Sequence, residues 1–165
     1  MKYEASLDRF ARSVTLGLFI LFIILANLSV GAIVRSENEP AIIIYNVVAI
    51  SIFFSFMAAC FLFAAKSYRI DEKNLTIVRW FNSKKIVLSD ISRVSEIPDR
   101  EMDGVMRNFG MGGIFGYRGK YLLSKIGAVT LYGTQRKNGI LIETIQGEKI
   151  VITPDDKRII EKLKR

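Results

Sequence analysis

The chain has 165 residues, is 50% hydrophobic and carries a formal net charge of +8. It contains no histidine and a single cysteine, which excludes histidine-based nucleophilic catalysis and a disulfide framework. Acidic and basic residues balance within residues 1–65, so the whole net charge belongs to residues 66–165. These features describe a small protein with an apolar first part and a basic, more polar second part.

Residues 1–12 form a short flank, and two uncharged apolar runs follow it. The runs span residues 13–34 and 41–65, with the polar segment 35–40 between them. At about 1.5 Å per residue, each run is long enough as a helix to cross the ~30 Å hydrocarbon core. The sequence therefore predicts two transmembrane helices joined by a tight turn.

Basic residues flank this predicted hairpin on one side. Lys2, Arg9 and Arg12 precede the first run, and Lys66 and Arg69 follow the second. The positive-inside rule then predicts a multi-pass protein of the cell membrane, with both termini and residues 66–165 in the cytoplasm and residues 35–40 outside. A cleaved signal peptide ending near residues 29–31 is the alternative, although the first run exceeds the usual apolar core of about 7–15 residues.

Residues 66–165 contain short runs rich in β-branched and aromatic residues. They predict strands at 67–70, 75–80, 85–88, 90–97, 128–132, 139–144 and 149–152. Residues 137–139 and the pair Gln146-Gly147 predict hairpin turns. Strands spaced about ten residues apart, with turn residues between them, favour a small antiparallel barrel or sandwich.

The last segment changes period. Thr153, followed by Pro154 and two aspartates, predicts a helix start, with threonine as N-cap and proline at the first position. Ile159, Ile160 and Leu163 would then share one face. We expect a short amphipathic C-terminal helix that caps the barrel.

The stretch 110–119 contains five glycines interleaved with apolar and aromatic residues. A phosphate-binding P-loop fits poorly, because Gly119-Lys120 is followed by tyrosine and position 114 is isoleucine. The dinucleotide-binding pattern fits poorly as well, because no helix follows. A structural role in tight turns is the second interpretation. The third is an interaction surface ringed by basic residues. Its candidate members are Arg107, Ile114, Phe115, Tyr117, Arg118 and Lys120.

Residues 99–103 hold the densest acidic patch, Asp99, Glu101 and Asp103, interrupted by Arg100. This pattern favours a solvated turn over a metal or catalytic site. We therefore predict no catalytic residue, no cofactor and no metal, and we do not expect an enzyme.

Residues 66–165 resemble the bacterial pleckstrin-homology-like (PH-like) domains found on small membrane proteins. The resemblance rests on residues 107–119, on residues 153–156, and on two strands that read IGAVTLYGT and ILIETIQGEKIVI. It implies two roughly orthogonal sheets in a partly open barrel, capped by a C-terminal helix, and no common catalytic centre.

Three functions are compatible with this pattern. The first is a membrane-anchored recognition or scaffold module that binds an unknown protein partner or self-associates. The second is recognition of anionic lipid head groups by the basic domain. The third, an enzyme or accessory subunit, is opposed by the lack of histidine. Nucleic acid is not an expected partner, because no helix carries a basic stripe.

Overall fold

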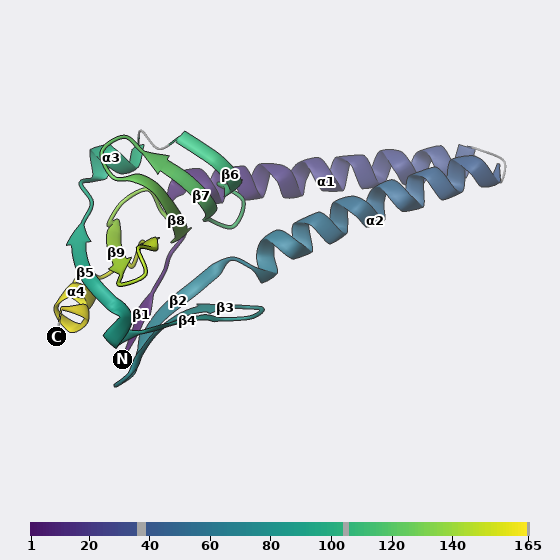
Figure 1. The fold of residues 1–165 in the computed structure, drawn as a ribbon. Helices are drawn as coiled ribbons and strands as arrows, with labels where there is room; N and C mark the ends of the chain where they lie inside the picture. The colour runs from purple at the N-terminus through teal and green to yellow at the C-terminus, as the bar shows by residue number, and fades with distance from the viewer. Residues whose placement is uncertain (36–38, 104–105, 165) are drawn as a thin grey trace.

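Two long helices and a β domain make up the chain (Figure 1). The computed structural model describes residues 1–35, 39–103 and 106–164, and for residues 103 and 106–111 it describes the backbone alone. Helix α1 (Arg9–Arg35) runs beside α2 (Pro40–Leu62), and the rings of Phe22 and Phe53 stack at 5.1 Å between them. Both helices are long and apolar enough to be candidate membrane spans.

The domain contains two sheets that do not close into a barrel. The first has the order β1-β2-β3-β4, with β1 (Lys2–Glu4), β2 (Ala65–Ile70), β3 (Asn74–Arg79) and β4 (Lys84–Val87). The second has the order β5-β9-β10-β8-β7-β6, with β5 (Ile91–Glu96), β6 (Met106–Gly112), β7 (Tyr117–Leu123), β8 (Gly127–Gly133), β9 (Ile140–Thr144) and β10 (Lys149–Ile152). The predicted class, two apolar helices followed by a mainly β PH-like domain, is confirmed.

The prediction of a wholly antiparallel barrel is wrong in one respect. Strand β10 pairs in parallel with β8, with Ile150 opposite Thr130, and antiparallel with β9. Because β10 lies between β8 and β9, residues 137–139 connect strands that are not neighbours and form no hairpin turn. The predicted turn at Gly147 is confirmed, since this glycine has φ 84° between β9 and β10.

The C-terminal helix begins later than predicted. Helix α4 covers Ile159–Leu163, and Thr153 is not its N-cap. Thr153 is instead fully buried, and its hydroxyl accepts a 2.9 Å hydrogen bond from the backbone N–H of Thr134. The predicted apolar face is confirmed, because Ile159, Ile160 and Leu163 are all buried.

Two further elements lie between strands. A 3₁₀ turn, η1 (Leu88–Asp90), precedes β5, and helix α3 (Asp99–Asp103) precedes β6. The acidic patch predicted as a turn therefore forms a short helix. Its residue Met102 is 2% exposed, so one side of α3 packs on the core.

The N-terminal flank is part of the domain. Strand β1 pairs antiparallel with β2, with Tyr3 opposite Tyr68, and the Met1 ammonium group donates a 2.7 Å hydrogen bond to the Ile70 carbonyl. Ser6 donates a 2.6 Å hydrogen bond from its hydroxyl to Asp155. A domain boundary at residue 66 therefore leaves out the first strand of the four-stranded sheet.

The six-stranded sheet is buried on both faces, which explains the continuous apolar runs of its central strands. Ile140, Ile142 and Ile152 pack toward the four-stranded sheet and α4. Leu141 and Val151 point the other way, into a second core that includes Ala11 of α1. The start of α1 is thus a component of the domain core.

Candidate functional site

The glycine-rich stretch forms the end of β6, the start of β7 and the turn 113–116 between them. Gly113 and Gly116 have φ values of 93° and 123°, which L side chains rarely adopt. A Cβ on Gly116 would lie 2.7 Å from the Gly133 carbonyl oxygen, so the turn also needs the missing side chain. Phe115 adopts φ 52°, an uncommon conformation for a bulky residue.

This turn docks on the helix pair. The Thr15 hydroxyl of α1 accepts a 3.0 Å hydrogen bond from the Phe115 N–H and donates one of 3.4 Å to the Gly113 carbonyl. The Phe115 ring meets Phe19 of α1 edge to face at 6.0 Å and Phe61 of α2 at 5.3 Å. Phe115 therefore contacts both helices at once.

Tyr117 points into the domain and is 6% exposed. Its hydroxyl donates a 3.0 Å hydrogen bond to Asp8 and accepts one of 3.1 Å from Arg136 Nε. Burial, and then the Asp8 carboxylate, raise the pKa of Tyr117 to about 12. Asp8 also accepts hydrogen bonds from the backbone N–H groups of Ala11, at 2.7 Å, and Arg136, at 3.1 Å.

A second turn with aromatic residues, between β3 and β4, packs against the end of α2. Trp80 stacks on Phe61 at 5.0 Å, and Phe81 meets Phe63 edge to face at 5.6 Å. The Phe81 N–H donates a 2.8 Å hydrogen bond to the Leu62 carbonyl, at the last residue of α2. Trp80 and Phe81 remain 53% and 56% exposed.

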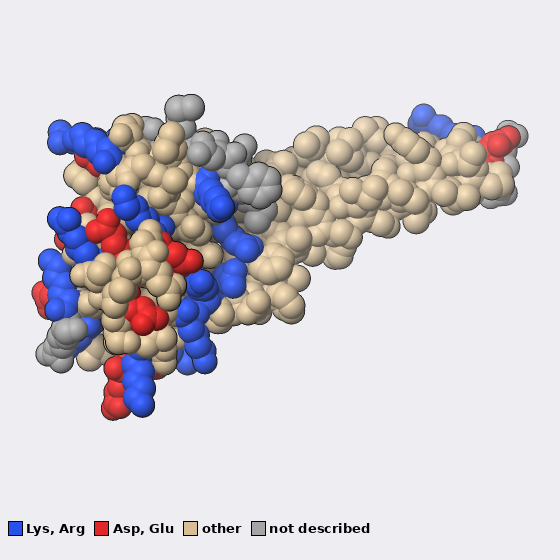
Figure 2. Space-filling model, in the orientation of Figure 1, with Lys and Arg blue, Asp and Glu red and all other residues tan. Residues whose placement is uncertain are grey.

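Three basic side chains lie over these aromatic rings. Lys66 Nζ is 3.8 Å from the centre of the Trp80 ring, and the guanidinium carbon of Arg118 is 4.6 Å from that of Phe63. The guanidinium carbon of Arg79 lies 6.0 Å from the same Phe63 ring. We call Lys66, Arg79 and Arg118 the basic junction. Figure 2 shows lysine and arginine side chains gathered on the side of the domain that faces the helices.

The basic junction lacks counter-ions. Within the described residues, none of the three side chains forms an ion pair with a carboxylate, and Arg79 Nε is buried without a hydrogen-bond partner. Desolvation, and then the charge of Arg118, lower the pKa of Arg79. Unneutralised guanidinium groups around one ring favour an anion, and phosphate suits their forked donors.

The predicted interaction surface is divided between the two faces of β7. Arg118 and the exposed Lys120 point outward, whereas Tyr117 points inward. Ile114 is half-buried. Arg107 lies in β6 opposite Tyr121, and its side chain is outside the described part of the chain.

Sequence reasoning missed Lys66, Arg79, Trp80 and Thr15 as parts of the site. They come from α1, β2, β3 and the turn after β3, so spacing along the chain does not group them. One signal was available, because the run Arg79-Trp80-Phe81 places a cation beside two aromatic residues at the end of a predicted strand.

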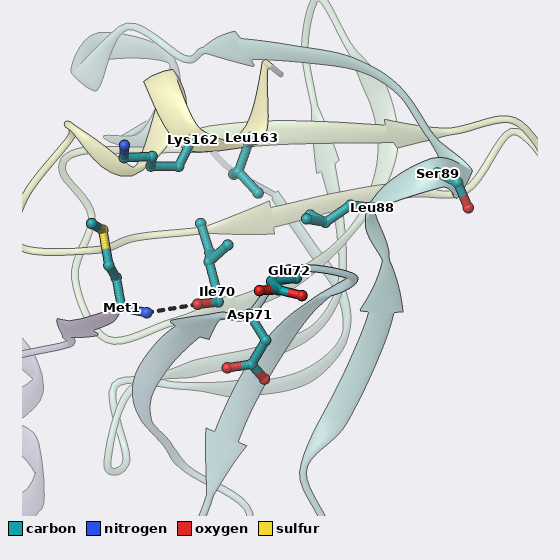
Figure 3. Close-up of a pocket in the computed structure, with 8 residues that line it drawn as sticks. All are labelled: Met1, Ile70, Asp71, Glu72, Leu88, Ser89, Lys162 and Leu163. Atoms are coloured by element: carbon teal, nitrogen blue, oxygen red, sulfur yellow. Dashed lines mark hydrogen bonds between the residues drawn. The ribbon is translucent and has the colours of Figure 1, made fainter.

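A separate open hollow of about 660 Å³ lies between β1, β2, η1 and α4. Figure 3 shows Ile70, Leu88 and Leu163 pointing into it, with the Met1 ammonium group bonded to the Ile70 carbonyl at its side. The charged residues Asp71, Glu72 and Lys162 also line this hollow. Among the described residues, no three His, Cys, Asp or Glu side chains form a group that could hold a metal.

The architecture defines a PH-like module carried on two apolar helices. Residues 66–165, more than half of the chain, match the family model of the bacterial PH domain, and the chain belongs to this family. The family consists of non-catalytic modules. No curated protein and no solved structure matches the chain. Strand β1 and the two helices lie outside the matched residues.

Proposed function

We propose that the protein is a membrane-anchored recognition module without catalytic activity. It binds anionic lipid head groups at the cytoplasmic surface of the cell membrane. Helices α1 and α2 form the anchor, and both chain termini lie in the cytoplasm. The supporting observation is the basic junction, which is placed where the helices meet the domain. Head groups lie at this level, and each basic residue near an anionic leaflet is worth about 1 kcal/mol.

Binding of a protein partner, or self-association, is a second candidate. Phe115 and Tyr117, the apolar centre of the surface predicted for it, are engaged within the chain. The outward face of β7 supplies another surface, because Leu122 is 41% exposed beside the exposed Lys120.

The lipid proposal predicts a selective stabilisation. The full chain in a mild, uncharged detergent should melt at a higher temperature with added phosphatidylglycerol than with phosphatidylcholine, because a ligand of the folded state stabilises it. Salt should reduce the difference through screening. The measurement is thermal unfolding followed by the fluorescence of Trp80. Equal melting temperatures in the two lipids at low salt would contradict the proposal.

The proposed orientation of the chain in the membrane, with the domain in the cytoplasm, is tested by cysteine labelling in a Cys60→Ser background. Glu39→Cys should react with a membrane-impermeant maleimide added to intact cells, whereas Lys120→Cys should react only after the cells are opened. Both positions are exposed, so accessibility within the protein does not limit either reaction. Labelling of position 120 from outside would place the domain on the other side of the membrane.

A further inference from the structure

An apolar groove of about 360 Å³ opens between α1 and α2, next to the domain. Aromatic rings from both helices line it, among them Phe19, Phe22, Phe53 and Phe61, with Ala58 between them and Phe115 bordering it from the domain. These helix residues fall within the predicted membrane spans. Acyl chains would surround these spans in a membrane, so an acyl chain is the occupant that suits an apolar groove at this depth.

The groove leads directly to the basic junction. Phe61 lines the groove and also stacks on Trp80, which lies under Lys66. On the other side, Phe115 lines the groove three residues before Arg118. The apolar groove therefore adjoins the basic junction, whose charges are not neutralised. An amphipathic molecule needs both features, an apolar groove for its tail and a cationic cluster for its head.

We propose that one anionic phospholipid binds at this place, with an acyl chain in the groove and its phosphate on Arg79 and Arg118, beside Lys66. This inference rests on the proposed function and narrows it from a charged surface to a single site. Charge complementarity favours an anionic lipid, because a zwitterionic head group such as phosphatidylcholine brings a choline cation with its phosphate and leaves the net charge of the basic junction unneutralised.

Trp80 provides the readout, since it is the single tryptophan of the chain and stacks on a residue of the groove. Lipids with brominated acyl chains quench tryptophan fluorescence on contact. The full chain is reconstituted in phosphatidylcholine nanodiscs with a small fraction of brominated phosphatidylglycerol. We expect quenching that saturates at a low fraction and exceeds that from brominated phosphatidylcholine at equal fractions.

The double substitution Arg79→Gln/Arg118→Gln should weaken the preference for phosphatidylglycerol by roughly 30-fold, equivalent to about 2 kcal/mol. The matched control is Lys162→Gln/Lys164→Gln, which removes the same charge from α4 and from the residue just after it, at the end of the domain away from the helices (Figure 1). The control should retain the preference. Arg118→Gln alone, which leaves the partly buried Arg79 in place, serves if the double variant does not fold.

The outcomes separate this site from the general proposal. If both double variants lose the preference for phosphatidylglycerol equally, and quenching never saturates, the proposal of a single site is overturned. A diffuse effect of charge would then explain the preference. Absence of any phosphatidylglycerol effect in both quenching and melting would overturn the proposed function as well. If soluble glycerol phosphate relieves the quenching, the site binds a free phosphate compound, and the proposal that it binds a lipid is overturned. Ala58→Phe, which fills the groove, should abolish selective quenching and keep the salt-sensitive stabilisation.

Discussion

Replacing Asp8 with alanine is expected to lower the free energy of unfolding of the domain by about 2–4 kcal/mol. The carboxylate caps α1 through the Ala11 N–H and accepts hydrogen bonds from the Tyr117 hydroxyl and the Arg136 N–H. Loss of the cap accounts for about 1 kcal/mol. The rest comes from donors left without an acceptor, at about 1–3 kcal/mol for a buried group. Chemical unfolding followed by Trp80 fluorescence measures the change.

Two variants serve as controls for this result. Glu4→Ala removes an acid from the same segment whose carboxylate pairs with Lys2 at the surface, so it should change stability by no more than about 1 kcal/mol. Asp8→Asn keeps an acceptor oxygen and should cost less than alanine. Equal stabilities of Asp8→Ala and Glu4→Ala would show that the N-terminal segment contributes little to the domain.

Alkaline pH gives an independent readout of the same contact. The folded-state pKa of Tyr117 is raised from its ordinary 10.0 to about 12, so its contribution to stability is complete below pH 10.0 and is lost as the pH rises toward about 12. The Asp8 carboxylate contributes to this increase. In Asp8→Asn the pKa of Tyr117 should therefore fall toward 10.0, so the alkaline loss of stability should be smaller and should be complete at a lower pH.

The part of the fold that sequence reasoning predicted depends on local patterns. Apolar runs identified the helix pair, and β-branched runs identified most strands. Strand β1 escaped prediction because Lys2–Glu4 is a short polar segment, and its pairing with β2 joins residues as distant as Met1 and Ile70. No local pattern reports such a contact. The parallel pairing of β8 with β10 was missed for the same reason.

The candidate site shows the same limit. The density of glycines marked residues 110–119 as unusual, and a structural role was one of three interpretations. The contacts that give the turn its role come from elsewhere, namely Thr15 in α1 and the Gly133 carbonyl at the end of β8. The role in anion binding that we propose for Arg118 likewise depends on Arg79, which only the folded chain brings beside the same Phe63 ring.

Contacts at several separate places hold the domain on the helices, and their combination fixes its orientation. Asp8 links the start of α1 to β7, Phe115 contacts both helices, and the Phe81 N–H bonds to the end of α2. A domain attached by one flexible linker could turn any face toward the membrane. Here the basic junction stays beside the helices, so the recognition surface that we propose is held in position before any lipid binds.

The turn 113–116 should be the contact most sensitive to a single methyl group. Gly116→Ala is expected to lower stability by about 2–5 kcal/mol, from backbone strain at φ 123° and from a Cβ placed 2.7 Å from the Gly133 carbonyl oxygen. The obstacle is backbone within a sheet, so it cannot rotate away as a side chain would. We expect the turn to leave its place and withdraw Phe115 from the helices.

Gly147→Ala is the matched control, because Gly147 also has a positive φ, 84°, but open space around the added Cβ. Strain alone should then cost about 1 kcal/mol. Unfolding measures both variants, and limited trypsin digestion reports the turn, since its withdrawal should expose the chain at Arg118 to faster cleavage in Gly116→Ala alone. Similar stabilities and cleavage rates in the two variants would show that close packing against Gly133 does not hold the turn. The glycine-rich stretch would then be free to act as the separate interaction loop that the sequence also allowed.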